Sequence, residues 1–119
     1  DDNPKSLTGV KKVPLRLNPP AALIYMAMGF KDGARKYGPY NWRTNKVAAS
    51  VYIDAIERHI QAYKDGQDTD ESGGPVLGHI LACAAILADA TESGNLIDDR
   101  PPAGPASRLL AEFTEKEKA

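Results

Sequence analysis

Apolar residues recur at the three- and four-residue spacing of an α-helix in three stretches of the chain. The spacing predicts helices at about 21–36, 45–64 and 75–90. The apolar stripe of the second helix consists of Ala49, Tyr52, Ile53, Ile56, Ile60 and Tyr63. The third helix is apolar almost all round, which is typical of a helix in the middle of a bundle or in a subunit interface.

Prolines and glycines mark where these helices begin and end. Residues 1–19 are polar and basic and finish next to a proline pair, which predicts an extended arm. Gly38-Pro39 ends the first helix, and Gly66 ends the second. The turn-rich segment 97–105 leads to a short amphipathic helix at about 106–116.

The predicted fold class is therefore all-α, a small helical bundle that forms one domain at 20–119. No stretch of useful length alternates as a strand would. Small side chains on the third helix, at Gly78, Ala82, Ala85 and Ala88, would let another helix approach closely. One small bundle would struggle to cover an entirely apolar helix, so we expect an oligomer, a homodimer or a homotetramer.

Charge and cysteine content narrow the class of protein. The chain has 15 basic and 16 acidic residues, and this balance disfavours a stable nucleic-acid complex. The single cysteine, Cys83, lies in an apolar run and is expected to be a buried thiol, which suits a reducing cytoplasm. The apolar stretch 76–88 is short for a membrane span, and no signal peptide is visible. We expect a cytoplasmic protein with no membrane partner.

Acidic residues gather at two places that suit a divalent cation. Asp54 and Glu57 are three apart on the second helix, so their carboxylates neighbour each other, and Glu57 borders the apolar stripe. Asp68, Asp70 and Glu71 form an acidic turn before the third helix. Mg²⁺ and Mn²⁺ prefer such oxygens. We predict metal ligands among Asp54, Glu57, Asp68 and Glu71; a solvated helix face and a helix cap are the alternatives. On this prediction, Glu57→Gln abolishes turnover and leaves the fold intact.

Two histidines add candidate acid–base chemistry. His79 is the one polar side chain in a long apolar stretch, and His59 is predicted to face the same interior. A hydrogen-bonded core histidine is the alternative for His79. Together with two carboxylates, they complete the set of candidate catalytic residues: Glu57, His59, Glu71 and His79. The chain lacks the H-E-x-x-H, His-Asp, Walker and Rossmann motifs.

A basic and aromatic segment, KYGPYNWR at 36–43, suits a nucleotide. Basic side chains hold phosphates, an asparagine amide can read the edge of a base, and an indole offers a stacking face. The predicted substrate-binding residues are Lys36, Asn41, Trp42, Arg43 and Arg58. The alternative for Trp42 is a plug in the core.

These segments together resemble the N-terminal domain family of phage dATP/dGTP diphosphohydrolases. This family includes MazZ-type enzymes and is similar to the all-α MazG nucleotide pyrophosphohydrolases. The resemblance covers about 11–96. It is carried by Gly33-Ala34-Arg35-Lys36-Tyr37-Gly38, Asn41-Trp42-Arg43, Arg58-His59, Glu71-Ser72-Gly73 and His79.

The resemblance implies hydrolysis of a purine deoxynucleoside triphosphate, dGTP or dATP, to the monophosphate and pyrophosphate with Mg²⁺ or Mn²⁺. It also implies a MazG-like bundle acting in the cytoplasm of an infected bacterium. The chain departs from its relatives at Val76, where they often have a histidine, and only Asp54-x-x-Glu57 matches part of the MazG acidic pattern. Two alternatives stay open: a nucleotide-binding module without catalysis, and a structural helical module of a phage.

Overall fold

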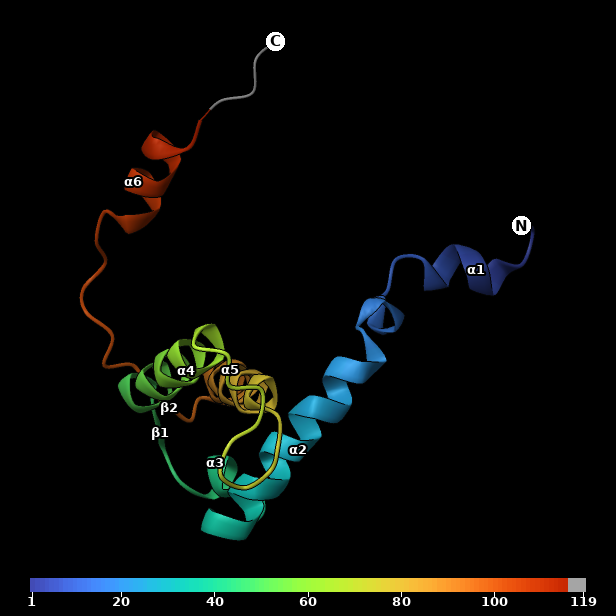
Figure 1. The fold of residues 1–119 in the computed structure, drawn as a ribbon. Helices are drawn as coiled ribbons and strands as arrows, with labels where there is room; N and C mark the ends of the chain where they lie inside the picture. Colours follow the sequence, from blue (N-terminus) through green and yellow to red (C-terminus); the bar gives the residue numbers. More distant parts are fainter. Residues whose placement is uncertain (116–119) are drawn as a thin grey trace.

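The computed structural model describes residues 1–115 and is mostly helical, as predicted (Figure 1). Along the chain the elements are α1 (Pro4–Gly9), a 3₁₀ turn (Leu15–Leu17), α2 (Pro20–Tyr37), α3 (Asn41–Thr44), β1 (Val47–Ala48), α4 (Ala49–Lys64), α5 (Val76–Ser93), β2 (Leu96–Ile97) and α6 (Ala106–Phe113). The three long helices, α2, α4 and α5, correspond to the three predicted from apolar spacing.

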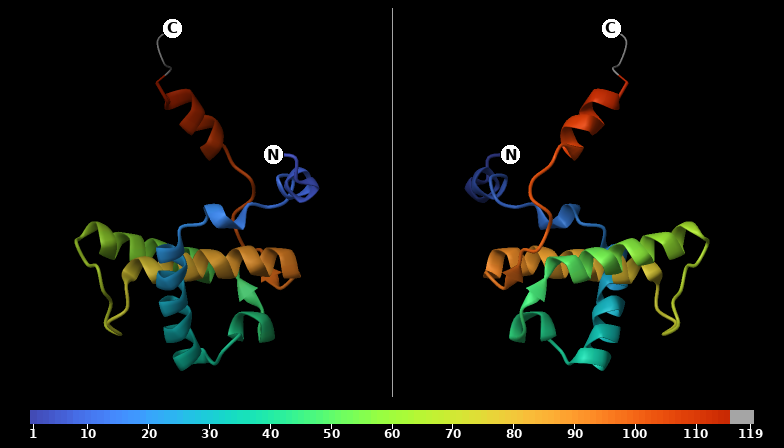
Figure 2. Two further views of the ribbon diagram at one scale, coloured as in Figure 1. Left: turned by 90° about the vertical axis from the view of Figure 1, so that its right-hand side faces the viewer. Right: turned by 90° about the vertical axis from the view of Figure 1, so that its left-hand side faces the viewer.

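Helix α5 occupies the centre of the fold. It packs against both α2 and α4, and Figures 1 and 2 show α4 lying alongside it while α2 crosses it. Its buried positions are Val76, Gly78, Ala82 and Ala90. Of the two places predicted for the most apolar helix, the middle of the bundle is therefore confirmed, and a subunit interface stays a prediction.

The crossing of α2 and α5 is unusually close because glycines meet there. A Cβ atom on Gly29 would lie 2.5 Å from the carbonyl oxygen of Gly78, and one on Gly78 would lie 2.2 Å from the carbonyl oxygen of Tyr25. Such distances are possible only where a side chain is absent. The crossing brings Asp32, one turn after Gly29, close to His79, the neighbour of Gly78.

Two local predictions were wrong. The arm at 1–19 is not wholly extended, because α1 forms there with Asn3 as its N-cap and Pro4 in its first turn. A strand pair also exists: β1 and β2 pair in parallel, so α4 begins at Ala49 rather than near 45. Two-residue strands are too short to show an alternating pattern.

The final helix also differs slightly from its prediction. It ends at Phe113, and the predicted end at 116 lies outside the described residues.

The two ends of the chain extend away from the three-helix body (Figure 2). Large apolar side chains are exposed on both of them: Leu7, Val10, Val13, Leu15, Leu17, Leu109, Leu110 and Phe113. The radius of gyration is 18.5 Å, whereas a compact domain of this length has roughly 13–14 Å. One chain therefore leaves much apolar surface uncovered.

By length and composition alone, α5 would also be able to cross a membrane. It has 18 residues, and 22% of them are buried. The apolar stretch 76–88, which the sequence indicated was short for a membrane span, is five residues shorter than this helix. The core helix of a soluble protein passes the same test of length and composition. The absence of a membrane partner stays a prediction.

Candidate active site

A cavity of about 880 Å³ lies among α2, the segment 38–42, α4, the turn at 70–71 and α5. Its volume falls within the range of small-molecule sites. Seven of the predicted site residues line it: Lys36, Asn41, Trp42, Arg58, His59, Glu71 and His79. Residues far apart in the sequence thus meet in one hollow.

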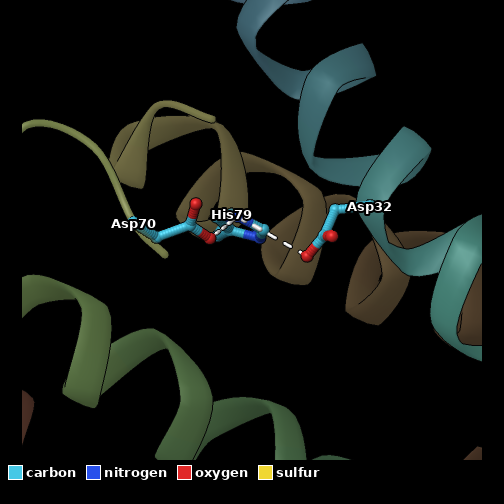
Figure 3. A group of neighbouring side chains, drawn as sticks. All are labelled: Asp32, Asp70 and His79. Carbon is cyan, nitrogen blue, oxygen red and sulfur yellow. Dashed lines mark ion pairs between the residues drawn. The ribbon is translucent and has the colours of Figure 1, made fainter. Parts of the chain in front are cut away.

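Two carboxylates and an imidazole converge in this cavity (Figure 3). Asp32 comes from α2, Asp70 from the turn before α5, and His79 from the first turns of α5. One ligand atom from each lies within 4.8 Å of the others. His79 Nε2 forms an ion pair with Asp70 Oδ2 and lies 4.0 Å from Asp32 Oδ2. We call these three residues the acidic–histidine cluster.

The turn at 70–74 fixes the orientation of Asp70. Its Oδ1 accepts hydrogen bonds from the backbone N–H groups of Ser72 (3.0 Å) and Gly74 (3.2 Å), and from the Ser72 hydroxyl. Gly73 has a φ of 83°, which a residue with a side chain rarely adopts. Because Oδ1 is engaged by the turn, Oδ2 points to His79. Helix α5 has Pro75 as its N-cap without a side-chain bond, so the acidic turn does not act as a cap.

Both carboxylates of the cluster are held in their ionised form. Hydrogen bonds from Arg35 (2.6 Å) and Lys36 (3.0 Å) keep the pKa of Asp32 below its ordinary value. Burial alone would raise the pKa of Asp70, but the bonds from Ser72 and the charge of His79 outweigh it, and the net shift is downward. Two anionic groups therefore face one imidazole nitrogen at neutral pH.

The cluster fits a divalent cation. Carboxylate oxygens are the ligands of Mg²⁺, whereas an imidazole nitrogen is accepted more readily by Mn²⁺ and related ions. Asp32 is only 8% exposed, and Arg35 and Lys36 already compensate part of its charge; a bound cation would compensate the charges of both carboxylates. Three protein ligands would leave other coordination positions for water and for phosphate oxygens.

His59 of α4 stacks on His79, and both side chains line the cavity. The ring centroids are 5.1 Å apart, and the planes differ by 18°. Burial lowers the pKa of His59, and the nearby His79 and Arg58 lower it further. The sequence prediction that both histidines face one interior is confirmed.

Asp32 is the cluster residue that the sequence argument missed. Its signal was present: on a helix it lies on the same face as Gly29 three positions earlier, and it precedes Arg35 and Lys36 at the spacing of helical ion pairs. Asp70 was considered only as part of the acidic turn. Both become conspicuous once α2 and α5 are placed against each other.

Four predicted site residues lie away from this cluster. Asp54 and Glu57 are exposed on α4, and neither belongs to the cavity lining. Asp68 is exposed as well, and its backbone carbonyl accepts a bond from Val76. Arg43 pairs with Asp89 of α5. The structure does not bring these side chains together, and their roles as ligands stay predictions.

Trp42 combines the two roles weighed for it. It lines the cavity, and its ring also lies 5.9 Å from the rings of both Phe30 and Tyr40. The cavity thus joins an aromatic wall to charged groups.

Cys83 was expected to be a buried thiol, but the structure leaves it only half-buried, and it also lines the cavity. Burial raises the pKa of its thiol.

Comparison with known proteins identifies the family. Neither the curated proteins nor the solved structures include a match to this chain. The model of the family described as dATP/dGTP diphosphohydrolase, N-terminal, matches residues 2–100. This match covers more than four fifths of the sequence, and it includes the acidic–histidine cluster and the aromatic segment. The chain therefore belongs to the dATP/dGTP diphosphohydrolase N-terminal family.

Proposed function

We propose that this domain hydrolyses dATP or dGTP to the monophosphate and pyrophosphate with the help of a divalent cation. The observation that carries the proposal is the acidic–histidine cluster within a cavity that also contains basic and aromatic side chains. Family membership supports the substrate class. The proposal reassigns the metal site from Asp54, Glu57, Asp68 and Glu71 to Asp32, Asp70 and His79.

The roles of the protein groups follow from their positions. Asp32, Asp70 and His79 would hold Mg²⁺ or Mn²⁺, which when bound supplies charge neutralisation for the triphosphate and a more acidic attacking water. His59, stacked on His79, keeps that imidazole oriented toward the two carboxylates. The turn at 70–74 does the same for Asp70.

Basic side chains on two walls of the cavity would hold the phosphates. Lys36 comes from α2 and Arg58 from α4, and both line the cavity. The Nζ atom of Lys36 lies 3.0 Å from Asp32 Oδ2, so this ammonium group is already beside the proposed metal ligands. Phosphate bound there would meet positive charge from both sides.

Removing the positive charge of Lys36 or of Arg58 should weaken substrate binding. We expect Lys36→Gln and Arg58→Gln each to raise KM for the triphosphate by about 10- to 100-fold, because charge-assisted hydrogen bonds contribute about 1.5–3 kcal/mol. Steady-state kinetics would measure the change. Lys64→Gln, an exposed change at the end of α4, is the matched control. Unchanged KM values in both variants would remove these residues from the phosphate site.

The aromatic wall would hold the base. Trp42 offers a stacking face, and stacking contributes roughly 1–3 kcal/mol per base. Asn41, next to it in the cavity lining, carries both a donor and an acceptor for a base edge. This arrangement supports a preference for purines, which have the larger stacking surface.

Incubation with a panel of nucleotides tests the proposal. The four deoxynucleoside triphosphates and their ribonucleotide counterparts are supplied with Mg²⁺ or Mn²⁺, and the products are separated by chromatography. We expect dGMP or dAMP and pyrophosphate. Release of nucleoside and tripolyphosphate would indicate a different chemistry, and no turnover of any nucleotide would reject the enzyme.

A nucleotide-binding module without catalysis is the second candidate. It is favoured by Val76, which is 1% exposed at the position where relatives often have a histidine, so the position offers no ligand atom to the cavity. This candidate predicts that dGTP or dATP raises the midpoint of thermal unfolding while no product forms.

We also propose that the domain is a homodimer or homotetramer. The exposed apolar side chains on the N-terminal arm and on α6 support this proposal, since their burial in a partner would be favourable. Light scattering at micromolar protein concentration should give at least twice the mass of one chain, 12.8 kDa. A strict monomer would contradict the oligomer.

A further inference from the structure

The aromatic wall of the cavity is anchored by contacts outside the acidic–histidine cluster. Arg43 follows Trp42 directly, and its side chain forms a two-pronged ion pair with Asp89 of α5, with Nε–Oδ2 and Nη2–Oδ1 distances of 2.6 Å. The Cζ atom of the same guanidinium lies 5.3 Å from the centroid of the Trp42 ring. One side chain thus connects the indole to the central helix.

The backbone of the same segment is tied to the chain after α5. Asn95 Nδ2 donates to the carbonyl oxygens of Trp42 (2.9 Å) and Asn45, and the Asn95 carbonyl accepts from Val47 (3.1 Å). Tyr40, just before this segment, has a φ of 61°, which is uncommon for a residue with a large side chain. Strained backbone persists where surrounding contacts hold it.

Two hollows of different size border Trp42. A second hollow of about 290 Å³ is lined by Trp42, Phe30, Ala85, Ile86 and Asp89. It shares Trp42, Phe30 and Ile86 with the large cavity. Trp42 therefore borders both hollows, whereas Asp89 lines only the smaller one. An indole released by Arg43 would be able to move into the smaller hollow.

We propose that Arg43 and Asp89 are positioning residues that hold the Trp42 indole against the cavity and thereby set the affinity for the base. In this proposal Arg43 acts through Trp42. The sequence suggested a different role for Arg43, which was contact with phosphate. The guanidinium of Arg43 keeps the pKa of Asp89 below its usual value, so the pair persists at neutral pH. The inference rests on the proposed function for the identity of the ligand.

Fluorescence offers a test that does not depend on activity, because Trp42 is the only tryptophan of the chain. Asp89→Asn keeps the side-chain size, whereas Arg43→Gln shortens the side chain; each change removes the ion pair. We expect acrylamide quenching of Trp42 to rise about twofold in each, with circular dichroism and thermal midpoint near wild type, because exposed ion pairs contribute little to stability. The double variant should equal the single ones. Arg108→Gln, which breaks the Arg108–Glu112 pair of α6, is the control.

Kinetics supplies the second half of the test. The same two variants should raise KM for the purine triphosphate about tenfold while kcat changes little, since base stacking binds substrate and transition state alike. Unchanged quenching in both variants would overturn the proposal, and so would an unchanged KM in an active enzyme. If the wild-type protein neither binds nor hydrolyses nucleotides, the proposed function fails, and the quenching result still decides whether the pair holds Trp42.

Discussion

Asp32→Asn is expected to reduce metal-dependent turnover more than 100-fold. Asparagine keeps the size of aspartate but removes the charge that a divalent cation requires. Substitution of groups that merely orient metal ligands costs about 10- to 100-fold, and loss of a ligand should cost more. Steady-state hydrolysis of dGTP and dATP at saturating Mn²⁺ would measure the change.

The fold should survive this substitution. Arg35, the cation nearest to Asp32, is 67% exposed in its side chain, so its charge returns to water when the carboxylate is lost. Lys36, the other cation bonded to Asp32, is 39% exposed in its side chain. Because Asp32 itself is buried, the thermal midpoint should fall moderately while the protein stays folded. Asp68→Asn is the matched control, because Asp68 is exposed and outside the cavity lining. Near-normal turnover by Asp32→Asn would remove Asp32 from the metal site.

The second large effect is expected at the crossing of α2 and α5. Gly78→Ala would place a Cβ atom 2.2 Å from the Tyr25 carbonyl oxygen, so two helix backbones must separate. Overpacking of this kind costs about 1–3 kcal/mol, which would lower the midpoint of thermal unfolding by roughly 5–15 °C. The separation would also move Asp32 away from His79, so Mn²⁺ should bind more weakly. Calorimetry would measure both effects.

Gly33→Ala provides the control for this prediction. Gly33 lies in the same helix, α2, and no atom lies within 4 Å of a Cβ built there. Alanine is favoured over glycine inside a helix by about 1 kcal/mol, so this variant should be slightly stabilised. Equal stability of Gly78→Ala and the wild type would show that the crossing tolerates a side chain.

The helices could be predicted from the sequence because their signals are local. Apolar spacing located α2, α4 and α5, and the apolar surface of α5 correctly indicated its central place. The strand pair could not be predicted in this way. Val47 and Ala48 pair with Leu96 and Ile97 across almost fifty residues, and two residues carry no periodic pattern.

The candidate site was predictable only in part, for the same physical reason. Asp54 and Glu57 were predicted as ligands because they lie three residues apart on one helix. The two carboxylates of the acidic–histidine cluster, in contrast, come from α2 and from the turn before α5. Asp32 meets His79 only because Gly29 and Gly78 allow two helices to cross closely. A tertiary crossing of this kind leaves a weak local signal. The aromatic segment was easier to recognise, since Asn41 and Trp42 are adjacent and both line the cavity.

Glu57 provides a direct comparison between the two assignments of the metal site. On the sequence alone, Glu57 is predicted to be a metal ligand, and Glu57→Gln is predicted to abolish turnover. The structure places Glu57 on the exposed side of α4, outside the cavity lining. If the acidic–histidine cluster holds the metal, Glu57→Gln retains activity and Asp32→Asn loses it. These two variants together separate the two assignments.

Titration of Mn²⁺ into the protein, followed by calorimetry, tests the acidic–histidine cluster most directly. If Asp32, Asp70 and His79 hold the metal, a binding site is present in the wild type, lost in Asp70→Asn and retained in Glu57→Gln. Asp70 is the better choice than Asp32 here because its loss leaves the Arg35 and Lys36 contacts on α2 in place. Binding that survives Asp70→Asn and disappears in Glu57→Gln would contradict the cluster and return the metal to α4.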